Sequence, residues 1–147
     1  MRKSLVIGFS VLAASVGPSL LAFAAEPSAV SSALAQSKLG PHSSAAQGVT
    51  VTVTPRDLSN DSKLWEFEVV FTTHSRDLRD DLTKTAVLMT SDGKRYPPVG
   101  WQGDGPGGHH RNGLLAFKPV SPRPQSVDLQ IQRAGEPAPR TFHWTLK

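Results

Sequence analysis

A two-residue alternation of apolar and polar side chains recurs in short runs along this sequence, and it limits the folds open to the chain. In the clearest run, residues 64–72, one face carries Trp65, Phe67, Val69 and Phe71. Successive residues of a strand point to opposite faces of a sheet. The run therefore predicts a strand at the centre of a sheet, with its aromatic face buried.

Six further short runs lie between turn residues, at positions 49–54, 85–90, 95–96, 114–117, 127–131 and 142–146. No stretch has a helical period long enough to compete. About seven short strands in about 100 residues predict an all-β fold, a single immunoglobulin-like antiparallel β-sandwich. We expect Leu78 and Leu82 to plug the edge of its core, and the centre to contain Trp65, Phe67, Val69, Phe71, Leu129, Phe142 and Trp144.

The start of the chain has the pattern of a signal peptide. Arg2 and Lys3 precede the largely apolar residues 5–21, and Ala22-Phe23-Ala24 places small residues where a signal peptidase cleaves. We expect residues 1–25 to be removed and the protein to be periplasmic or extracellular. A retained membrane anchor is the alternative, but the apolar stretch is short for a span of roughly 20 residues. No membrane span is expected after cleavage.

Residues 26–47 are rich in Ala, Ser and Pro and show no apolar period. This composition predicts a flexible linker, in which His42 is a solvated side chain. The sandwich domain is then expected to occupy residues 48–147.

The composition excludes several classes of protein. The chain has no cysteine, so disulfides, thiolate metal ligands and cysteine nucleophiles are all excluded. Loss of Arg2 and Lys3 with the signal peptide leaves 14 of the 16 basic residues against 12 acids, a net charge of +2. These charges are scattered rather than gathered in a basic stripe, so no nucleic-acid partner is expected.

A glycine-rich loop carries the side chains most suited to function. Five of the 12 glycines fall between Gly100 and Gly108, and His109, His110 and Arg111 follow directly. Glycine allows backbone conformations with positive φ, and loops of this kind often hold binding residues.

The paired histidines predict a metal site. Imidazole is a common ligand of copper and zinc, and His74, just past the end of the second strand, is the expected third ligand beside His109 and His110. Asp77 or Asp104 could complete the shell. Two alternatives stay open for the histidines: general-base chemistry, or a structural role in which one bonds loop backbone and the other faces solvent.

A second hypothesis needs no metal. Trp101 could stack on a sugar or a proline-rich peptide, or it could be a lid over the end of the sandwich. Arg111 could pair with Asp104 across the loop or bind an anionic ligand. In this interpretation Trp101, Asp104 and Arg111 form the binding loop of an interaction module of the cell envelope.

Neither catalysis nor calcium binding is favoured. No glycine elbow surrounds a serine, and Ser75 is adjacent to His74, a spacing that rarely aligns a nucleophile with its base. Arg76 and Arg79 interrupt the acids of residues 77–81, unlike an oxygen-ligand loop. We therefore expect a non-enzymatic binding protein.

Three segments also carry a resemblance. Thr73-His74-Ser75-x-Asp77-Leu78, then Trp101 with Gly105-Pro106-Gly107-Gly108-His109-His110-Arg111, then Arg140-x-Phe142-x-Trp144 resemble a small family of exported bacterial proteins of unknown function. The resemblance spans residues 49–146, and its proline-glycine-histidine motif is the most specific part. It implies an immunoglobulin-like fold and a secreted setting, and it implies no activity.

Overall fold

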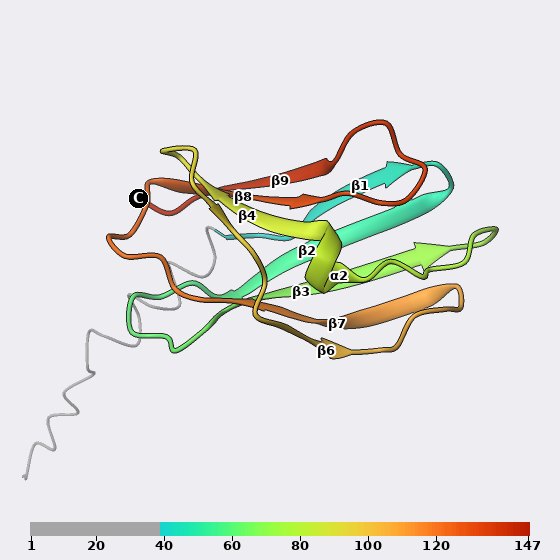
Figure 1. The fold of residues 1–147 in the computed structure, drawn as a ribbon, viewed down its shortest axis with the longest axis horizontal. Helices are drawn as coiled ribbons and strands as arrows, with labels where there is room; N and C mark the ends of the chain where they lie inside the picture. The colour runs from blue at the N-terminus through green and yellow to red at the C-terminus, as the bar shows by residue number, and fades with distance from the viewer. Residues whose placement is uncertain (1–38) are drawn as a thin grey trace, which may run out of the picture.

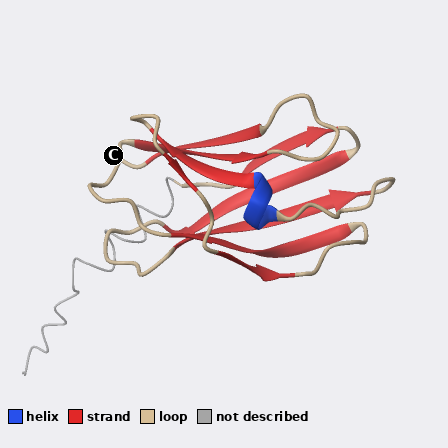
Figure 2. Ribbon diagram, viewed as in Figure 1, coloured by secondary structure: helices blue, strands red, loops and turns tan. Residues whose placement is uncertain are grey.

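The computed structural model describes residues 39–147, so the predicted signal peptide and most of the predicted linker lie outside the described residues. This part of the chain contains nine strands and one short helix, shown in Figure 2. They are β1 (His42–Ala46), β2 (Val49–Asp57), β3 (Trp65–Thr73), α2 (Leu82–Thr85), β4 (Ala86–Thr90), β5 (Arg95–Tyr96), β6 (Gly100–Gly103), β7 (His110–Phe117), β8 (Ser126–Ile131) and β9 (Arg140–Thr145).

The strands form two antiparallel sheets packed face to face (Figure 1). One sheet has the order β1-β2-β3-β7-β6, and the other has the order β5-β4-β8-β9. Without β1, these orders correspond to the ABED and C′CFG sheets of an immunoglobulin-type sandwich. The predicted all-β sandwich is confirmed. Residues 39–147 contain no helix with the length and hydrophobicity that crossing a membrane requires.

The core lies between the sheets and is built by the alternation seen in the sequence. Phe67 of β3 is fully buried. Its ring centroid lies 5.8 Å from that of Phe117 on the neighbouring strand β7, and 5.4 Å from that of Trp144 on β9 of the opposite sheet. Leu78 and Leu82 are also buried at its edge. The predicted core set is confirmed, because each member is at most 2% exposed: Trp65, Phe67, Val69, Phe71, Leu129, Phe142 and Trp144.

The linker prediction is wrong for residues 42–46, which form β1 on the edge of the first sheet. Gln47 and Gly48, with φ of 53° and 76°, make the two-residue turn into β2, and positive φ at both positions is typical of a type I′ turn. His42 stacks on Trp144 with ring centroids 5.1 Å apart, so it belongs to the folded domain. The sandwich domain therefore begins at residue 42 or earlier, and not at residue 48 as the composition predicted.

The glycine-rich region is also more regular than its composition indicates. Residues 100–103 form β6, which pairs with β7, and β7 begins at His110 rather than near Leu114. Only residues 104–109 remain as the loop between these strands, and we call them the β6–β7 loop. Trp101 and Arg111, predicted on a loop, lie on strands.

Candidate functional site

Four connecting segments meet at one end of the sandwich, on the right in Figure 1. They are the β1–β2 turn (47–48), the segment after β3 (74–81), the β6–β7 loop (104–109) and the β8–β9 loop (132–139). We call this region the loop end. All the histidines and acids proposed from the sequence as ligands lie here.

The backbone of the β6–β7 loop is bonded to the segment after β3. Gly107 N–H donates to the Leu78 carbonyl at 2.7 Å, and Leu78 N–H donates to the Gly108 carbonyl at 3.3 Å. Thr73 N–H donates to the His109 carbonyl at 2.9 Å. Gly107 and Gly108 have φ of 116° and 75°, which only glycine adopts readily. These two glycines therefore use the conformational freedom that the sequence offers.

Asp104, Trp101 and Arg111 hold the base of the same loop. The Asp104 carbonyl accepts hydrogen bonds from the Trp101 indole at 3.0 Å and from Nε of Arg111 at 3.1 Å. The Asp104 carboxylate accepts from the Asn112 backbone at 2.9 Å, while Arg111 also donates to the Asp80 carbonyl at 2.6 Å. Arg111 is 3% exposed, and its guanidinium lies over the Trp101 ring at 5.3 Å.

These contacts decide between the two interpretations of Trp101. Its ring covers Gly113 of β7, because a Cβ atom there would lie 2.5 Å from Cζ2 of Trp101. Trp101 is thus a lid packed on the core, not a free stacking platform. The pairing of Arg111 with Asp104 also differs from expectation, since it uses the backbone carbonyl rather than the carboxylate.

The three histidines share the loop end but do not form one metal site. His74, His109 and His110 are all exposed, and His110 pairs with Thr72 across β3 and β7. Across residues 39–147, no three side chains of the His, Cys, Asp or Glu types are grouped closely enough to hold a metal ion. The proposed shell with Asp77 or Asp104 is not assembled in this conformation.

The acids of residues 77–81 are used in local structure. Asp77 bonds Arg79, which lowers the pKa of Asp77. Asp81 caps helix α2 by accepting from Thr83, and the Thr83 side-chain hydrogen bond lowers the pKa of Asp81. These carboxylates do not converge on one point, as a calcium site would require.

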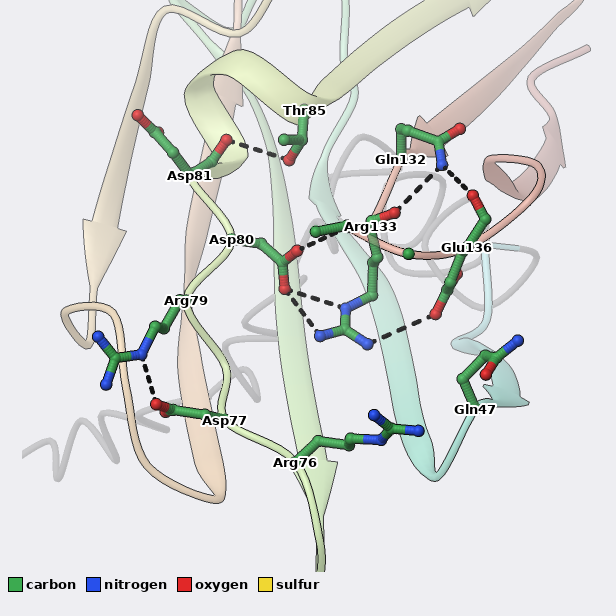
Figure 3. A pocket seen from close by; sticks show the side chains of 12 residues that line it. Gln47, Arg76, Asp77, Arg79, Asp80, Asp81, Thr85, Gln132, Arg133 and Glu136 are labelled. Carbon is green, nitrogen blue, oxygen red and sulfur yellow. Dashed lines mark hydrogen bonds and ion pairs between the residues drawn. The ribbon is translucent and has the colours of Figure 1, made fainter.

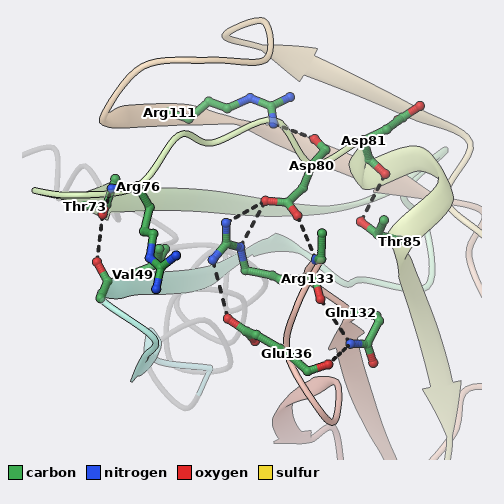
Figure 4. Close-up of polar contacts among 12 residues, drawn as sticks. Val49, Thr73, Arg76, Asp80, Asp81, Thr85, Arg111, Gln132, Arg133 and Glu136 are labelled. Atoms are coloured by element: carbon green, nitrogen blue, oxygen red, sulfur yellow. Dashed lines mark hydrogen bonds and ion pairs between the residues drawn. The ribbon is translucent and has the colours of Figure 1, made fainter.

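A buried ion network, missed from the sequence, forms the floor of the loop end (Figure 4). Asp80 accepts from Nε and Nη2 of Arg133 at 3.0 and 2.9 Å. Glu136 bonds Arg140 at 2.5 Å and Arg133 at 3.4 Å. The spacing of Arg133, Glu136 and Arg140 in the sequence was a visible signal, but the partner Asp80 is 53 residues away.

Arg140 joins this network to the β1–β2 hairpin. Its guanidinium donates to the carbonyls of Ser44, Ala46 and Val49 at 2.8 to 2.9 Å. The hydrogen bond from Arg140 lowers the pKa of the Glu136 carboxyl below its usual value, against the opposing effect of burial. No buried side-chain nitrogen or oxygen among the described residues lacks a partner.

An open cleft of about 650 Å³ lies above this floor, as Figure 3 shows. Gln47 and Arg76 line one side, Arg79 lines the other, and Arg133 with Glu136 forms the base. Its volume falls in the range of roughly 300–1,000 Å³ that is typical of ligand pockets. The cleft adjoins the β6–β7 loop, since a Cβ atom at Gly107 would lie 3.8 Å from Oδ1 of Asp77.

No family model matches the sequence. No curated protein matches it either. Among solved structures, the chain is similar to a DUF4426 family protein from Pseudomonas aeruginosa PAO1, with 20% identity and a TM-score of 0.44, over 70% of this chain and 92% of that chain.

Proposed function

We propose that the protein is an exported, non-enzymatic interaction module of the cell envelope, which presents the β6–β7 loop to a protein partner. The observation that carries this proposal is the bonding of an exposed, glycine-rich loop to neighbouring segments. A loop already held in one conformation loses little conformational entropy on binding, so more of the contact energy appears as affinity.

The exposed parts of this loop determine what a partner would contact. Trp101 and Arg111 are occupied in holding the base, whereas Pro106, His109 and His110 are exposed. Backbone groups of the glycines and two imidazoles would therefore make the contacts. This differs from the sequence hypothesis, in which Trp101 and Arg111 met the ligand directly.

Copper or zinc binding remains the alternative function. It is favoured by the backbone hydrogen bond from Thr73 to His109, which brings the next residue, His74, to the same edge of the loop end. A metal that binds only the folded protein raises the melting temperature in a concentration-dependent way. If the metal function is right, copper or zinc raises the melting temperature of the wild type, and the double variant His109→Ala, His110→Ala loses that rise.

Site-specific photocrosslinking in cells tests the interaction function. A photoreactive amino acid replaces His109 in one variant and, as a matched control, the exposed Asp61 in the β2–β3 connection at the opposite end. We expect a discrete crosslinked product from position 109 alone, and we expect it to persist with a metal chelator. Because this variant lacks the His109 imidazole, the metal function is tested by the melting-temperature rise of the wild type and not by crosslinking. Equal products from both positions, or none from position 109, would contradict it.

A further inference from the structure

The charges around the cleft do not cancel, and the excess resides on one residue. The residues that line the cleft include three guanidinium groups and four carboxylates, and Lys84 and Arg140 pair with two of those carboxylates from outside the lining, so the five basic groups exceed the four acids by one. Each carboxylate has its own basic partner: Asp77 with Arg79, Asp80 with Arg133, Asp81 with Lys84, and Glu136 with Arg140. Within residues 39–147, the Arg76 guanidinium has neither an ion pair nor a hydrogen bond, because the Arg76 contact with Thr73 uses its backbone N–H.

Arg76 is also placed to receive a ligand. A Cβ atom at Gly48 would lie 4.0 Å from Cγ of Arg76 and 3.2 Å from Oγ of Ser75, so the stem of Arg76 lies against the β1–β2 turn. Figure 3 shows its guanidinium extended toward Gln47, on the same side of the cleft, and lower in this view than Arg133 and Glu136. A guanidinium with an adjacent side-chain amide offers several N–H donors to one planar anion.

We propose that this cleft binds the carboxylate of an acidic peptide segment, with Arg76 as the group that pairs with it. The proposal rests on the proposed interaction function and names the chemistry of the partner. A carboxylate matches the single uncompensated charge. A phosphate group carries about −1.5 to −2 at neutral pH and would approach the carboxylates of Asp77, Asp80 and Glu136. The volume of about 650 Å³ accommodates more than one residue of a peptide.

The cleft and the β6–β7 loop form one continuous surface. Asp77 lines the cleft, while the adjacent Leu78 bonds the backbone of Gly107 and Gly108. A partner that contacts the loop could therefore place an acidic side chain or its own C-terminal carboxylate against Arg76. Because the two surfaces are continuous, they favour a peptide over a free metabolite as the ligand.

Titration of the purified protein with a minimal carboxylate tests the site. N-acetyl-diglycine mimics a peptide C-terminus, and its amide is the matched neutral probe. We expect saturable changes in the amide NMR signals of Gln47, Gly48 and Arg76 with the acid but not with the amide. Arg76→Gln should weaken binding at least tenfold. Arg95→Gln removes an exposed arginine of β5 that forms no ion pair within residues 39–147, and it should leave binding unchanged.

Several outcomes would overturn the proposal. They are no response in the cleft, an equal response to the amide, equal binding by Arg76→Gln, or tighter binding of inorganic phosphate at the same signals. Failure here with position-109 crosslinking retained would remove this site but keep the interaction module. Carboxylate binding without crosslinking from position 109 would keep this site and remove the interaction module.

Discussion

Gly113 is the residue on which the Trp101 lid depends most directly. A Cβ atom at this position would lie 2.5 Å from the Trp101 ring and 2.6 Å from the Gln102 carbonyl. Gly113→Ala must displace the indole or the β6 strand, and we expect a loss of about 1–3 kcal/mol in the free energy of unfolding. Chemical denaturation measures this loss.

Gly105→Ala is the control for that change. Gly105 lies in the β6–β7 loop, has no positive φ, and has open space where a Cβ atom would be. The free energy of unfolding of Gly105→Ala should differ from that of the wild type by no more than about 0.5 kcal/mol. If the two variants are equally stable, the ring of Trp101 is not packed against Gly113.

Glu136 should make stability depend on acid pH. Its pKa is lowered in the folded protein, chiefly by Arg140, so its contribution is present above its ordinary value of 4.5 and is lost as pH falls through the lowered pKa. Glu136→Gln leaves the buried Arg140 guanidinium without its carboxylate, while Arg133 keeps Asp80, and should cost about 3–5 kcal/mol at pH 7.

The comparison across pH isolates this effect from other carboxylates. Denaturation of wild type and Glu136→Gln should show a stability gap that is constant between pH 7 and pH 5 and narrows below pH 4.5. A gap that stays constant to the lowest pH at which both proteins fold would mean that Glu136 does not titrate as the structure requires.

Burial of individual residues was largely predictable, and Arg111 shows where the prediction stopped. Alternation in β3 placed Trp65 and Phe67 correctly inside. In β7 the inward positions continue back from Leu115 through Gly113 to Arg111. A glycine and an arginine carry no apolar signal, so the alternation was invisible there, and a buried scaffold residue was interpreted as a ligand contact.

At the scale of elements, β1 and β6 escaped prediction for the same physical reason. β1 consists of His, Ser and Ala side chains that are exposed on most positions, and β6 contains two glycines in four residues. Each strand forms because a partner strand or Arg140 satisfies its backbone, and such partners are distant in sequence. Local composition therefore predicted a linker and a loop.

A pair of proline substitutions tests whether β1 is part of the folded domain. Thr73 N–H bonds His109 next to β7, so by alternation Thr72 faces β2 and its partner Thr50 faces β3. Val51 then faces β1, so its partner Ser44 faces β2 while Ala45 lies on the free edge. Ser44→Pro should remove a ladder hydrogen bond and cost about 1–3 kcal/mol, while Ala45→Pro should change stability by about 0.5 kcal/mol or less. Equal and negligible effects in thermal denaturation would restore the linker interpretation.

At the scale of the whole molecule, strand spacing was sufficient for the fold class but not for the assembly of the loop end. Short alternating runs separated by turns allowed few architectures other than a sandwich. Which loops meet depends on strand order, and the network joins Asp80 to Arg133 and Arg140 to Val49, which are 53 and 91 residues apart. The cleft and its unpaired Arg76 follow from those long-range contacts.

The central claim is that the loop end is fixed before any partner binds, and backbone ¹⁵N relaxation tests it most directly. A glycine-rich, exposed loop without tertiary bonds would have order parameters below about 0.6. The hydrogen bonds that hold Asp104 and residues 107–109 predict values near 0.85 for the amides of these four residues, equal to those of β3 and β7. Values below about 0.6 in this loop, with rigid flanking strands, would contradict the account.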